Sequence, residues 1–273
     1  MGINLEKTLV VYNSEIEGAR DFAVLVAEKL QNSSLVSISD IDKSQKPTLV
    51  VVIGGDGSYL RCAREFSDDE VPIFGFNMGH LGFLVQVKPD ELSAAVEQIL
   101  NDKFKIENRM MLETIIDGKK YLALNDFVVK GKTFSRTSVY ELYINDNFVS
   151  RYLADGLIIS TPTGSTAYTL SAGGPVISPD LASIAIVPIC PHTLNARPIV
   201  VGADEKIKIK CVDCTSAEYK LTADGQEEVR ANSEIEISRS KTNAKILLLS
   251  EGENNFYTIL REKFGWGVAP KKW

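Results

Sequence analysis

The fold is decided by the stretch Thr48-Leu49-Val50-Val51-Val52-Ile53-Gly54-Gly55-Asp56-Gly57-Ser58-Tyr59-Leu60. Its first half is a run of apolar and mostly β-branched residues, which is typical of a strand buried on both faces. Glycines and one aspartate end the run. Apolar residues then recur at three-residue spacing, as in a helix, with Ser58 as the expected N-cap. A carboxylate is therefore predicted on a glycine-rich turn between a buried strand and a helix N-terminus.

This turn suits phosphate, because glycines expose backbone N–H groups and the helix dipole adds partial positive charge. An aspartate there repels phosphate, so Asp56 is expected to bind a cation or to take a proton from a hydroxyl beside the phosphates. A tight turn capped by Asp56 is the structural alternative. Two common nucleotide motifs are absent. No lysine follows the glycines, and a dinucleotide fingerprint that started at Gly55 would fail at Leu60.

The composition limits the class of protein. A length of 273 residues fits two modest domains or one large one, and 44% hydrophobic with 24% charged residues is usual for a globular protein. A net charge of −6 weighs against nucleic acid as a partner. No apolar run could span a bilayer and no signal peptide is evident, so no membrane partner and a cytoplasmic location are expected. Cys211 and Cys214 form C-x-x-C without a second ligand pair, which predicts reduced thiols.

The pattern changes near residue 101. Strands and helices alternate before it, which predicts an α/β domain with a parallel sheet over residues 1–101. Short strands separated by turns follow, which predicts an all-β, sandwich-like domain over residues 102–254. A helix at about 255–267 is expected to return to the first domain. The predicted strands cover residues 9–12, 35–38, 49–53, 71–76, 111–116, 121–130, 139–144, 148–153, 156–160, 182–189, 198–201, 206–211, 218–223, 234–238 and 244–249.

Three polar stretches stand out from this pattern. Residues 77–84 follow a buried strand, and a structural role for His80 is favoured there over a catalytic one. Asn125-Asp126 interrupts an apolar strand, which indicates a site or a bulge. Residues 160–168 are rich in hydroxyl groups, and Tyr168 offers a flat face for a base; a surface loop with a capped helix is the alternative.

Together these stretches resemble the NAD kinase family. The glycine–aspartate turn alone is shared with diacylglycerol, sphingosine and 6-phosphofructo kinases, whereas the match over residues 155–168 is far more specific. The resemblance covers about residues 9–264. It rests on Gly54-Gly55-Asp56-Gly57, Asn77-Met78-Gly79-His80-Leu81-Gly82-Phe83-Leu84, the stretch from Asp155 to Tyr168, Pro191-His192-Thr193-Leu194, Arg197-Pro198 and Asp224-Gly225-Gln226.

The resemblance implies a nucleotide site between an α/β and a β domain, and transfer of the γ-phosphoryl group of ATP to the 2′-hydroxyl of the adenosine ribose of NAD. It implies that Asp56 is the catalytic base and that Mg²⁺ is held mainly through the ATP phosphates, without protein metal ligands. A homodimer or homotetramer is expected. The implied nucleotide-binding residues are Gly55, Gly57, Arg61, Asn125, Asp126, Arg136, Asp155, Thr163, Thr166, Ala167, Tyr168, Ser171 and Gln226.

Two positions depart from the family pattern. Many members have Glu where this chain has Asp126, which shortens the reach of the carboxylate expected on a ribose hydroxyl. Many also have arginine where this chain has Leu153, so a cationic contact is lost there, and Arg136 or Arg151 is the candidate substitute. The alternative functions are a lipid or sphingoid-base kinase with the same turn, and a regulatory module that binds a dinucleotide.

Asp155 is expected to act on the site of a neighbouring subunit. It ends a predicted strand pair rich in aromatic residues, Tyr143, Phe148 and Tyr152, which are more rings than a free sheet edge should expose. The alternative is that these rings pack inside their own domain and that Asp155 caps a turn.

Overall fold

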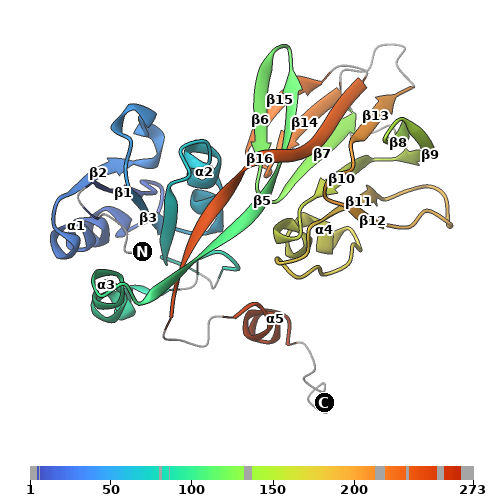
Figure 1. Cartoon of the computed structure of the whole chain (residues 1–273). Coiled ribbons are helices and arrows are strands. Elements are labelled where there is room, and N and C mark those ends of the chain that lie inside the picture. The colour runs from blue at the N-terminus through green and yellow to red at the C-terminus, as the bar shows by residue number, and fades with distance from the viewer. Residues whose placement is uncertain are drawn as a thin grey trace. The chain divides into compact units, whose positions relative to one another are not determined.

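The structure is a computed structural model that describes residues 5, 7–79, 82–85, 87–131, 137–212, 219–231, 234–250 and 255–265. The chain forms two compact units, which we call unit 1 (residues 1–108 and 244–273) and unit 2 (residues 109–243). The strands β5 (Phe104–Ile116) and β16 (Glu234–Leu249) contribute residues to both units (Figure 1). The predictions for His80, Arg136 and Cys214 lie outside the described residues.

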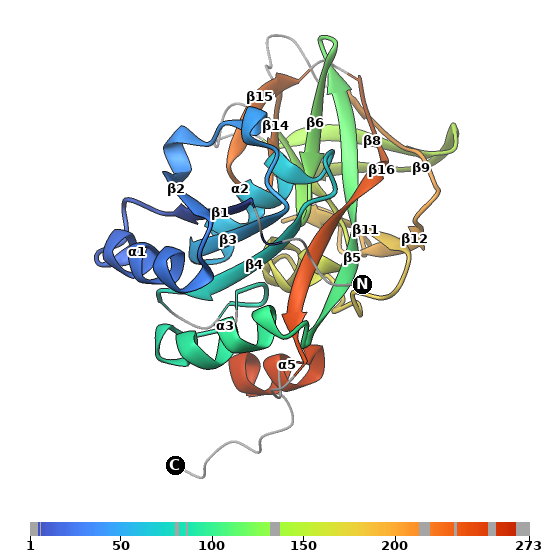
Figure 2. The ribbon, with the colours of Figure 1, turned by 60° about the vertical axis from the view of Figure 1, so that its left-hand side comes forward.

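Unit 1 is built on a parallel sheet with the strand order β2-β1-β3-β4-β16. The central strand β3 is buried over its whole length, as expected from its continuous apolar run. The strands of unit 1 are β1 (Thr8–Tyr12), β2 (Ser33–Ser37), β3 (Leu49–Gly54) and β4 (Pro72–Asn77), together with the end of β16 (Figure 2). Its helices are α1 (Ala19–Leu30), α2 (Asp56–Phe66), α3 (Leu92–Leu100) and α5 (Phe256–Phe264).

Helices cover both faces of this sheet. The apolar sides of α1 and α3 pack in one cluster with Phe74 and Phe76 of β4. Between these two residues, Gly75 faces the other side of the sheet, because side chains alternate along a strand. A Cβ atom built on Gly75 would lie 3.2 Å from the ring of Tyr59, so α2 packs against this second face.

Unit 2 consists of antiparallel strands whose side chains meet in one core. A six-stranded sheet has the order β12-β11-β10-β7-β14-β15, and β16, β13, β8 and β9 pair in a second layer. Both layers contribute side chains to the core cluster, as in a β sandwich. The remaining strands are β6 (Lys119–Ala123), β7 (Asp126–Gly131), β8 (Ser138–Ile144), β9 (Asn147–Ala154), β10 (Gly156–Ser160), β11 (Ser183–Ile189), β12 (Ile199–Gly202), β13 (Ile207–Cys211), β14 (Tyr219–Ala223) and β15 (Glu227–Ala231).

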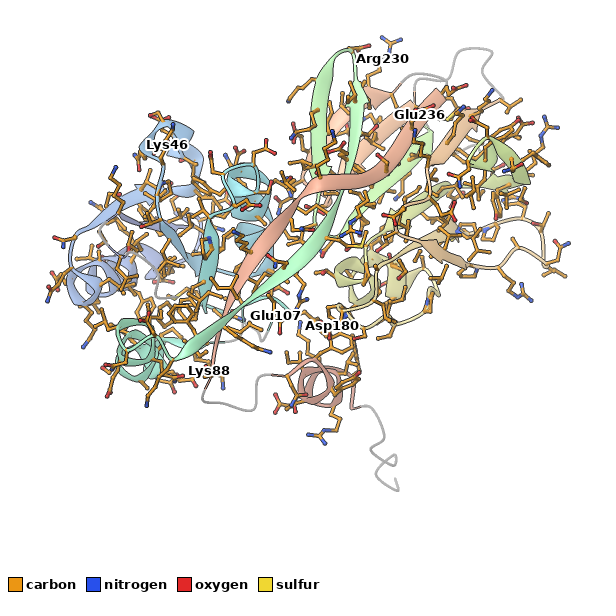
Figure 3. The ribbon with its side chains drawn as sticks, viewed as in Figure 1. Lys46, Lys88, Glu107, Asp180, Arg230 and Glu236 are labelled. Atoms are coloured by element: carbon orange, nitrogen blue, oxygen red, sulfur yellow. The ribbon has the colours of Figure 1, made fainter. Side chains whose placement is uncertain are left out.

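Alternation along β16 shows how the sequence pattern produces this layer. Glu236 is exposed and projects from the strand (Figure 3), whereas its neighbours Ile235 and Ile237 are buried in the core. The predicted fold class, an α/β unit with a parallel sheet and a β unit with antiparallel strands, is confirmed. Within the described residues, no helix has the length and apolar character needed to span a membrane.

Several local predictions are wrong. Ser58 is not the N-cap of α2, because the helix begins at Asp56 with Gly55 as its cap. Residues 234–249 form one continuous strand rather than two, since the polar segment in the middle of β16 stays extended. The strand predicted over residues 121–130 is interrupted at 124–125, and β15 was not predicted because charged residues alternate along it. Tyr152 is buried and does not add to an exposed aromatic edge.

Candidate functional site

In unit 1, the predicted turn forms a close junction between β3 and α2. Gly54 ends the buried strand, and a Cβ atom on it would lie 2.6 Å from Oγ of Ser58, so glycine permits the close approach of strand and helix. Gly55 is extended, and Asp56 and the exposed Gly57 occupy the first turn of α2. The positive end of the helix dipole and the N–H groups of this turn favour an anion.

The carboxylate of Asp56 accepts three backbone hydrogen bonds. Oδ2 accepts from N–H of Phe83 at 2.8 Å, and Oδ1 accepts from N–H of Leu84 at 3.1 Å and of Val85 at 3.0 Å. A Cβ atom on Gly82 would lie 2.0 Å from Oδ1, so only glycine allows this segment to pass the carboxylate. Since a carboxylate has about four acceptor directions, these hydrogen bonds from the described residues leave one of them unfilled.

Asn77 organises the segment that contacts Asp56. Its side chain is buried at the end of β4, where Nδ2 donates to the carbonyl of Val85 at 2.9 Å and Oδ1 accepts from N–H of Gly79 at 2.9 Å. The polar stretch that follows β4 is therefore held against the predicted catalytic carboxylate. The close approach to Asp56 explains why the sequence carries glycine at position 82.

In unit 2, four of the predicted nucleotide-binding residues line one cavity of about 330 Å³. The lining residues as a whole come from three separate parts of the sequence, residues 125–130, 167–168 and 222–225. The cavity falls in the size range of small-molecule sites. It is lined by the predicted residues Asn125, Asp126, Ala167 and Tyr168 and by Val128, Lys130, Thr222, Asp224 and Gly225.

Tyr168 begins the short helix α4 (Tyr168–Ser171) and is 38% exposed. Nζ of Lys130 donates to its hydroxyl at 3.0 Å and lies 4.9 Å from the centre of its ring. The ammonium group therefore fixes the ring while a large part of the ring stays open to a ligand. A base can stack on such a ring without the protein having to order the side chain first.

Asp126 is 3% exposed and lies at the start of β7. Burial, and to a smaller degree the charge of the neighbouring Asp224, raises the pKa of its carboxyl to about 7. Asp126 can thus change its protonation state near neutral pH. The shorter side chain at this family position still lines the cavity.

The other predicted residues take different places. In unit 1, Arg61 is half-buried on α2, one helical turn after Gly57. In unit 2, Thr163 is buried in a short 3₁₀ helix (Thr163–Thr166), where its carbonyl accepts from Oγ1 of Thr166 at 3.3 Å. Neither threonine lines the cavity. Three further predicted residues are exposed and do not line it either: Asp155, Ser171 and Gln226. Arg151 is engaged by Glu141, with Nη2 and Oε1 2.8 Å apart, and Leu153 on the same strand is 37% exposed.

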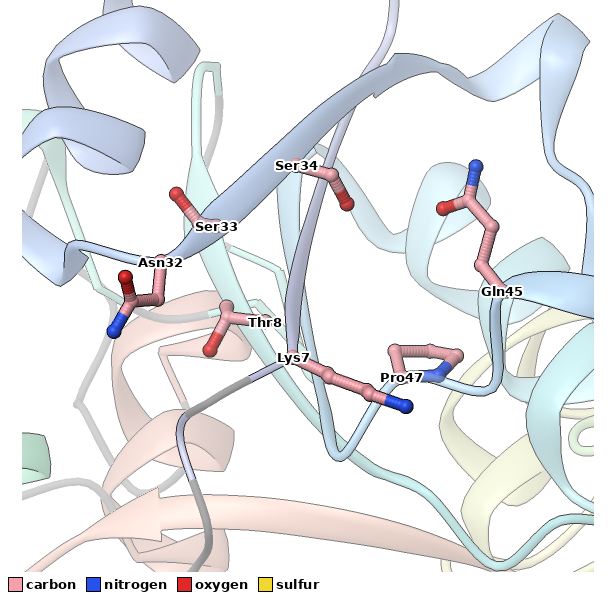
Figure 4. A pocket seen from close by; sticks show the side chains of 7 residues that line it. All are labelled: Lys7, Thr8, Asn32, Ser33, Ser34, Gln45 and Pro47. Carbon is pink, nitrogen blue, oxygen red and sulfur yellow. The ribbon is translucent and has the colours of Figure 1, made fainter.

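A second cavity, of about 430 Å³, lies in unit 1 at the amino ends of β1 and β2 (Figure 4). Two of its hydroxyls already donate to backbone carbonyls, Oγ1 of Thr8 to Leu5 at 3.2 Å and Oγ of Ser33 to Ala27 at 2.9 Å. Ligands of parallel sheets bind at the carboxyl ends of the strands, where Asp56 lies, so we assign no function to this cavity.

Comparisons with known proteins identify the family. Residues 15–104 match the family described as ATP-NAD kinase N-terminal domain, and residues 124–249 match the ATP-NAD kinase C-terminal domain. The NAD kinase of Moorella thermoacetica is 45% identical over 224 residues, which are 80% of this chain and 71% of that protein. The chain belongs to the NAD kinase family. Its activity is the ATP-dependent phosphorylation of NAD, as the sequence predicted.

Other NAD kinases extend the comparison. That of Azotobacter vinelandii is 40% identical over 247 residues, which are 89% of this chain and 84% of that protein. A crystal structure of an NAD kinase from Archaeoglobus fulgidus in complex with ATP matches with a TM-score of 0.79 and 27% identity over 95% of this chain and 97% of that one. Yeast NADH kinase complexed with NADH matches with a TM-score of 0.84 at 22% identity, over 98% of this chain and 89% of that one, and shares the fold.

Five lining residues of the cavity were not predicted as site residues. Asp126, Val128 and Lys130 follow one another at two-residue spacing. Their side chains therefore lie on one face of the strand, with a carboxylate and an ammonium group on either side of a valine. This alternation is a signal that could have placed Lys130 beside Asp126. Asp224-Gly225 was recognised as a turn and as part of the family pattern, but only the pairing of β14 with β7 places it at Asp126.

Proposed function

We propose that Asp56 takes the proton of the NAD 2′-hydroxyl as the γ-phosphoryl group of ATP is transferred. A ribose hydroxyl is a poor nucleophile, and a carboxylate within hydrogen-bond reach assists its attack. The hydrogen bonds from the N–H groups of Phe83, Leu84 and Val85 support this role, because they hold the carboxylate in one orientation and leave an acceptor direction open. The alternative, Asp56 as an anchor for this segment only, predicts a different mutant phenotype.

We propose that the cavity of unit 2 binds NAD, with the adenine on the ring of Tyr168 and ribose hydroxyls on Asn125 and Asp126. The observation that carries this assignment is the convergence of these side chains, distant in sequence, on one cavity. Ala167 lines the same cavity, and its small side chain leaves room for the adenine. Thr163, Thr166, Ser171, Gln226 and Asp155 are proposed as contacts to the remaining parts of the nucleotides.

The phosphates are proposed to lie at the N-terminus of α2. Gly55 and Gly57 give access to backbone N–H groups there, and Arg61 follows Gly57 by four residues, which places both on one side of the helix. Among the described residues, no three His, Cys, Asp or Glu side chains gather to hold a metal ion. We therefore propose that Mg²⁺ binds mainly through the ATP phosphates, where it would neutralise charge on the transferred group.

A coupled assay with NAD, ATP and Mg²⁺ tests the proposal in comparison with its alternatives. The expected result is formation of NADP that depends on all three components. Phosphorylation of a sphingoid base or diacylglycerol instead of NAD would indicate the lipid-kinase alternative. Binding of NAD without any turnover would indicate a regulatory module. We propose a cytoplasmic location for the enzyme, in line with the buried, reduced thiol of Cys62.

NAD affinity is expected to fall with pH below about 7. An ionised Asp126 accepts hydrogen bonds from ribose hydroxyls, whereas protonation removes an acceptor, and the raised pKa of about 7 places this change near neutrality. The dissociation constant should therefore be about tenfold higher at pH 6 than at pH 8. Calorimetric titrations over this range measure it. Asp126→Asn should bind NAD more weakly at pH 8 and show a flat pH dependence, and a slope that persisted in this variant would exclude Asp126 as its source.

We propose that the enzyme is a homodimer or homotetramer assembled through unit 2. The outermost strand of its second layer, β9, carries Phe148, Val149 and Leu153 with exposed side chains, and the ring of Tyr143 packs on Phe148 at 5.5 Å. A free edge with such side chains invites pairing with another chain. Asp155 directly follows β9 and is exposed, so this assembly would carry it toward a neighbouring subunit.

Complementation tests the role of Asp155 across subunits. Asp56→Asn and Asp155→Ala, each expected to be weakly active, are unfolded and refolded together in equal amounts. If Asp155 serves the site of a neighbour, mixed dimers regain one intact site in two, and about a quarter of the wild-type activity returns. Activity no higher than the mean of the two parents, with mixed oligomers confirmed by mass, would place both residues in the site of one subunit.

A further inference from the structure

Asp224 lies on the Asp-Gly turn that joins β14 to β15, with a φ of 50° at Asp224 and 67° at Gly225. Its carboxylate accepts three consecutive backbone hydrogen bonds. Oδ2 accepts from N–H of Leu124 at 3.1 Å, and Oδ1 accepts from N–H of Asn125 at 2.7 Å and of Asp126 at 3.2 Å. Successive N–H groups that converge on one anion fix the backbone that carries them.

The same three residues are also held from the side of β10. The carbonyl of Asn125 accepts from N–H of Thr161 at 2.9 Å and from Oγ of Ser160 at 3.2 Å. Oγ1 of Thr161 donates to the carbonyl of Leu124 at 2.6 Å. Residues 124 and 125 thus interrupt the run of strand between β6 and β7, Asp126 begins β7, and the side chains of Asn125 and Asp126 line the cavity.

We propose that Asp224 is a positioning residue for NAD, because its carboxylate holds segment 124–126 in the conformation that presents Asn125 and Asp126 to the ligand. This inference rests on the proposed binding of NAD in this cavity. Asp224 needs no contact with NAD for this role, which distinguishes it from the residues assigned to the ribose.

The charge of Asp224 has a second effect. The charged and titratable groups that line the cavity around Asp126 are Asp224 from the β14–β15 turn, Lys130 from β7 and Tyr168 from α4. The ammonium group of Lys130 donates to the hydroxyl of Tyr168, and the negative charge of Asp224 adds to burial in raising the pKa of Asp126. Removal of this charge should therefore make Asp126 easier to ionise.

Titration of the ligand-free protein tests whether the charge of Asp224 raises the pKa of Asp126, and it does so without relying on NAD. The carboxyl carbon of Asp126 is followed by NMR from pH 4 to 9, with Asp126→Asn to assign its signal. The wild type should titrate near pH 7, and Asp224→Asn should titrate at lower pH, since asparagine tolerates the left-handed conformation but is neutral. Asp117→Asn, in the exposed Asp-Gly turn between β5 and β6, is the matched control and should titrate like the wild type. An unchanged midpoint in Asp224→Asn would overturn this part of the proposal.

NAD affinity tests the geometry. At pH 8, Asp224→Asn should bind NAD about tenfold more weakly, because its amide group cannot accept from all three N–H groups. Asp117→Asn should bind like the wild type. Thr161→Val keeps the charge of Asp224 but removes the hydroxyl that donates to the carbonyl of Leu124 and accepts from N–H of Gly164. It should weaken NAD binding without moving the titration midpoint of the Asp126 carboxyl.

The outcomes separate the two proposals. Wild-type affinity in a folded Asp224→Asn variant would overturn the positioning role. If Asp224→Asn does not fold, as judged by circular dichroism, Asp224→Glu, which keeps the charge but displaces the carboxylate, replaces it in the affinity measurement and should also bind NAD more weakly; wild-type affinity in that variant would overturn the role. If the wild type fails to bind NAD while the midpoint of Asp126 still shifts in Asp224→Asn, the electrostatic role of Asp224 stands and the assignment of the cavity to NAD is wrong.

Discussion

Asp56→Asn is expected to lower kcat by about 10²–10⁴-fold, the usual contribution of a general base, while the dissociation constant for NAD changes little. The asparagine has nearly the same shape but cannot take the proton of the 2′-hydroxyl. NAD binding should persist because the residues proposed to contact the adenine and its ribose lie in unit 2. Steady-state kinetics with saturating ATP and Mg²⁺ measure kcat, and calorimetry measures NAD binding.

This substitution needs a control for structure, because Asp56 also accepts three backbone hydrogen bonds. In the variant, the NH₂ group of the asparagine would replace Oδ2 and face the N–H of Phe83, two donors that cannot bond to each other. This would loosen the segment from Gly82 to Val85. Asn77→Ser loosens the same segment from its other side, since it removes the donor to the carbonyl of Val85, but leaves the carboxylate in place. If Asp56 is the general base, the loss of kcat should be far larger in Asp56→Asn than in Asn77→Ser. Comparable losses would reduce Asp56 to an anchor.

Tyr168→Ala is expected to weaken NAD binding by about 1–3 kcal/mol, which corresponds to about five- to 150-fold in the dissociation constant. The variant removes the half-open ring that lines the cavity and leaves the ammonium group of Lys130 without its acceptor. The effect should appear in NAD affinity and in KM for NAD rather than in the thermal stability of unit 2, since the ring is 38% exposed.

Tyr168→Phe is the matched control for stacking. It keeps the ring and removes only the hydroxyl that accepts from Lys130 at 3.0 Å. Stacking predicts affinity close to that of the wild type for phenylalanine and a large loss for alanine. A loss of equal size in both variants would assign the contribution to the hydroxyl and to Lys130. Unchanged affinity in a folded Tyr168→Ala variant would leave the ring with a packing role only.

Local sequence patterns were sufficient for the elements that bury one continuous apolar stretch. The run from Leu49 to Ile53 predicted a strand buried on both faces and the glycines after it predicted a turn into a helix, and β3 and α2 confirm both. Family-specific residues were equally informative for the activity, because their chemistry is local. The polar pair Asn125-Asp126 indicated a site or a bulge in an apolar strand, and the strand is interrupted at residues 124–125, directly before Asp126 begins β7.

Tertiary structure decided what depends on contacts between distant residues. Nothing near Asp56 in the sequence shows that Phe83, Leu84 and Val85 donate to its carboxylate, because a segment after the next strand of the parallel sheet supplies these groups. Likewise, only the pairing of β14 with β7 sets Asp224 beside Asp126. The sequence determined the family and predicted which residues carry the chemistry, whereas the raised pKa of Asp126 and the orientation of Asp56 follow from burial and from hydrogen bonds that only the folded chain provides.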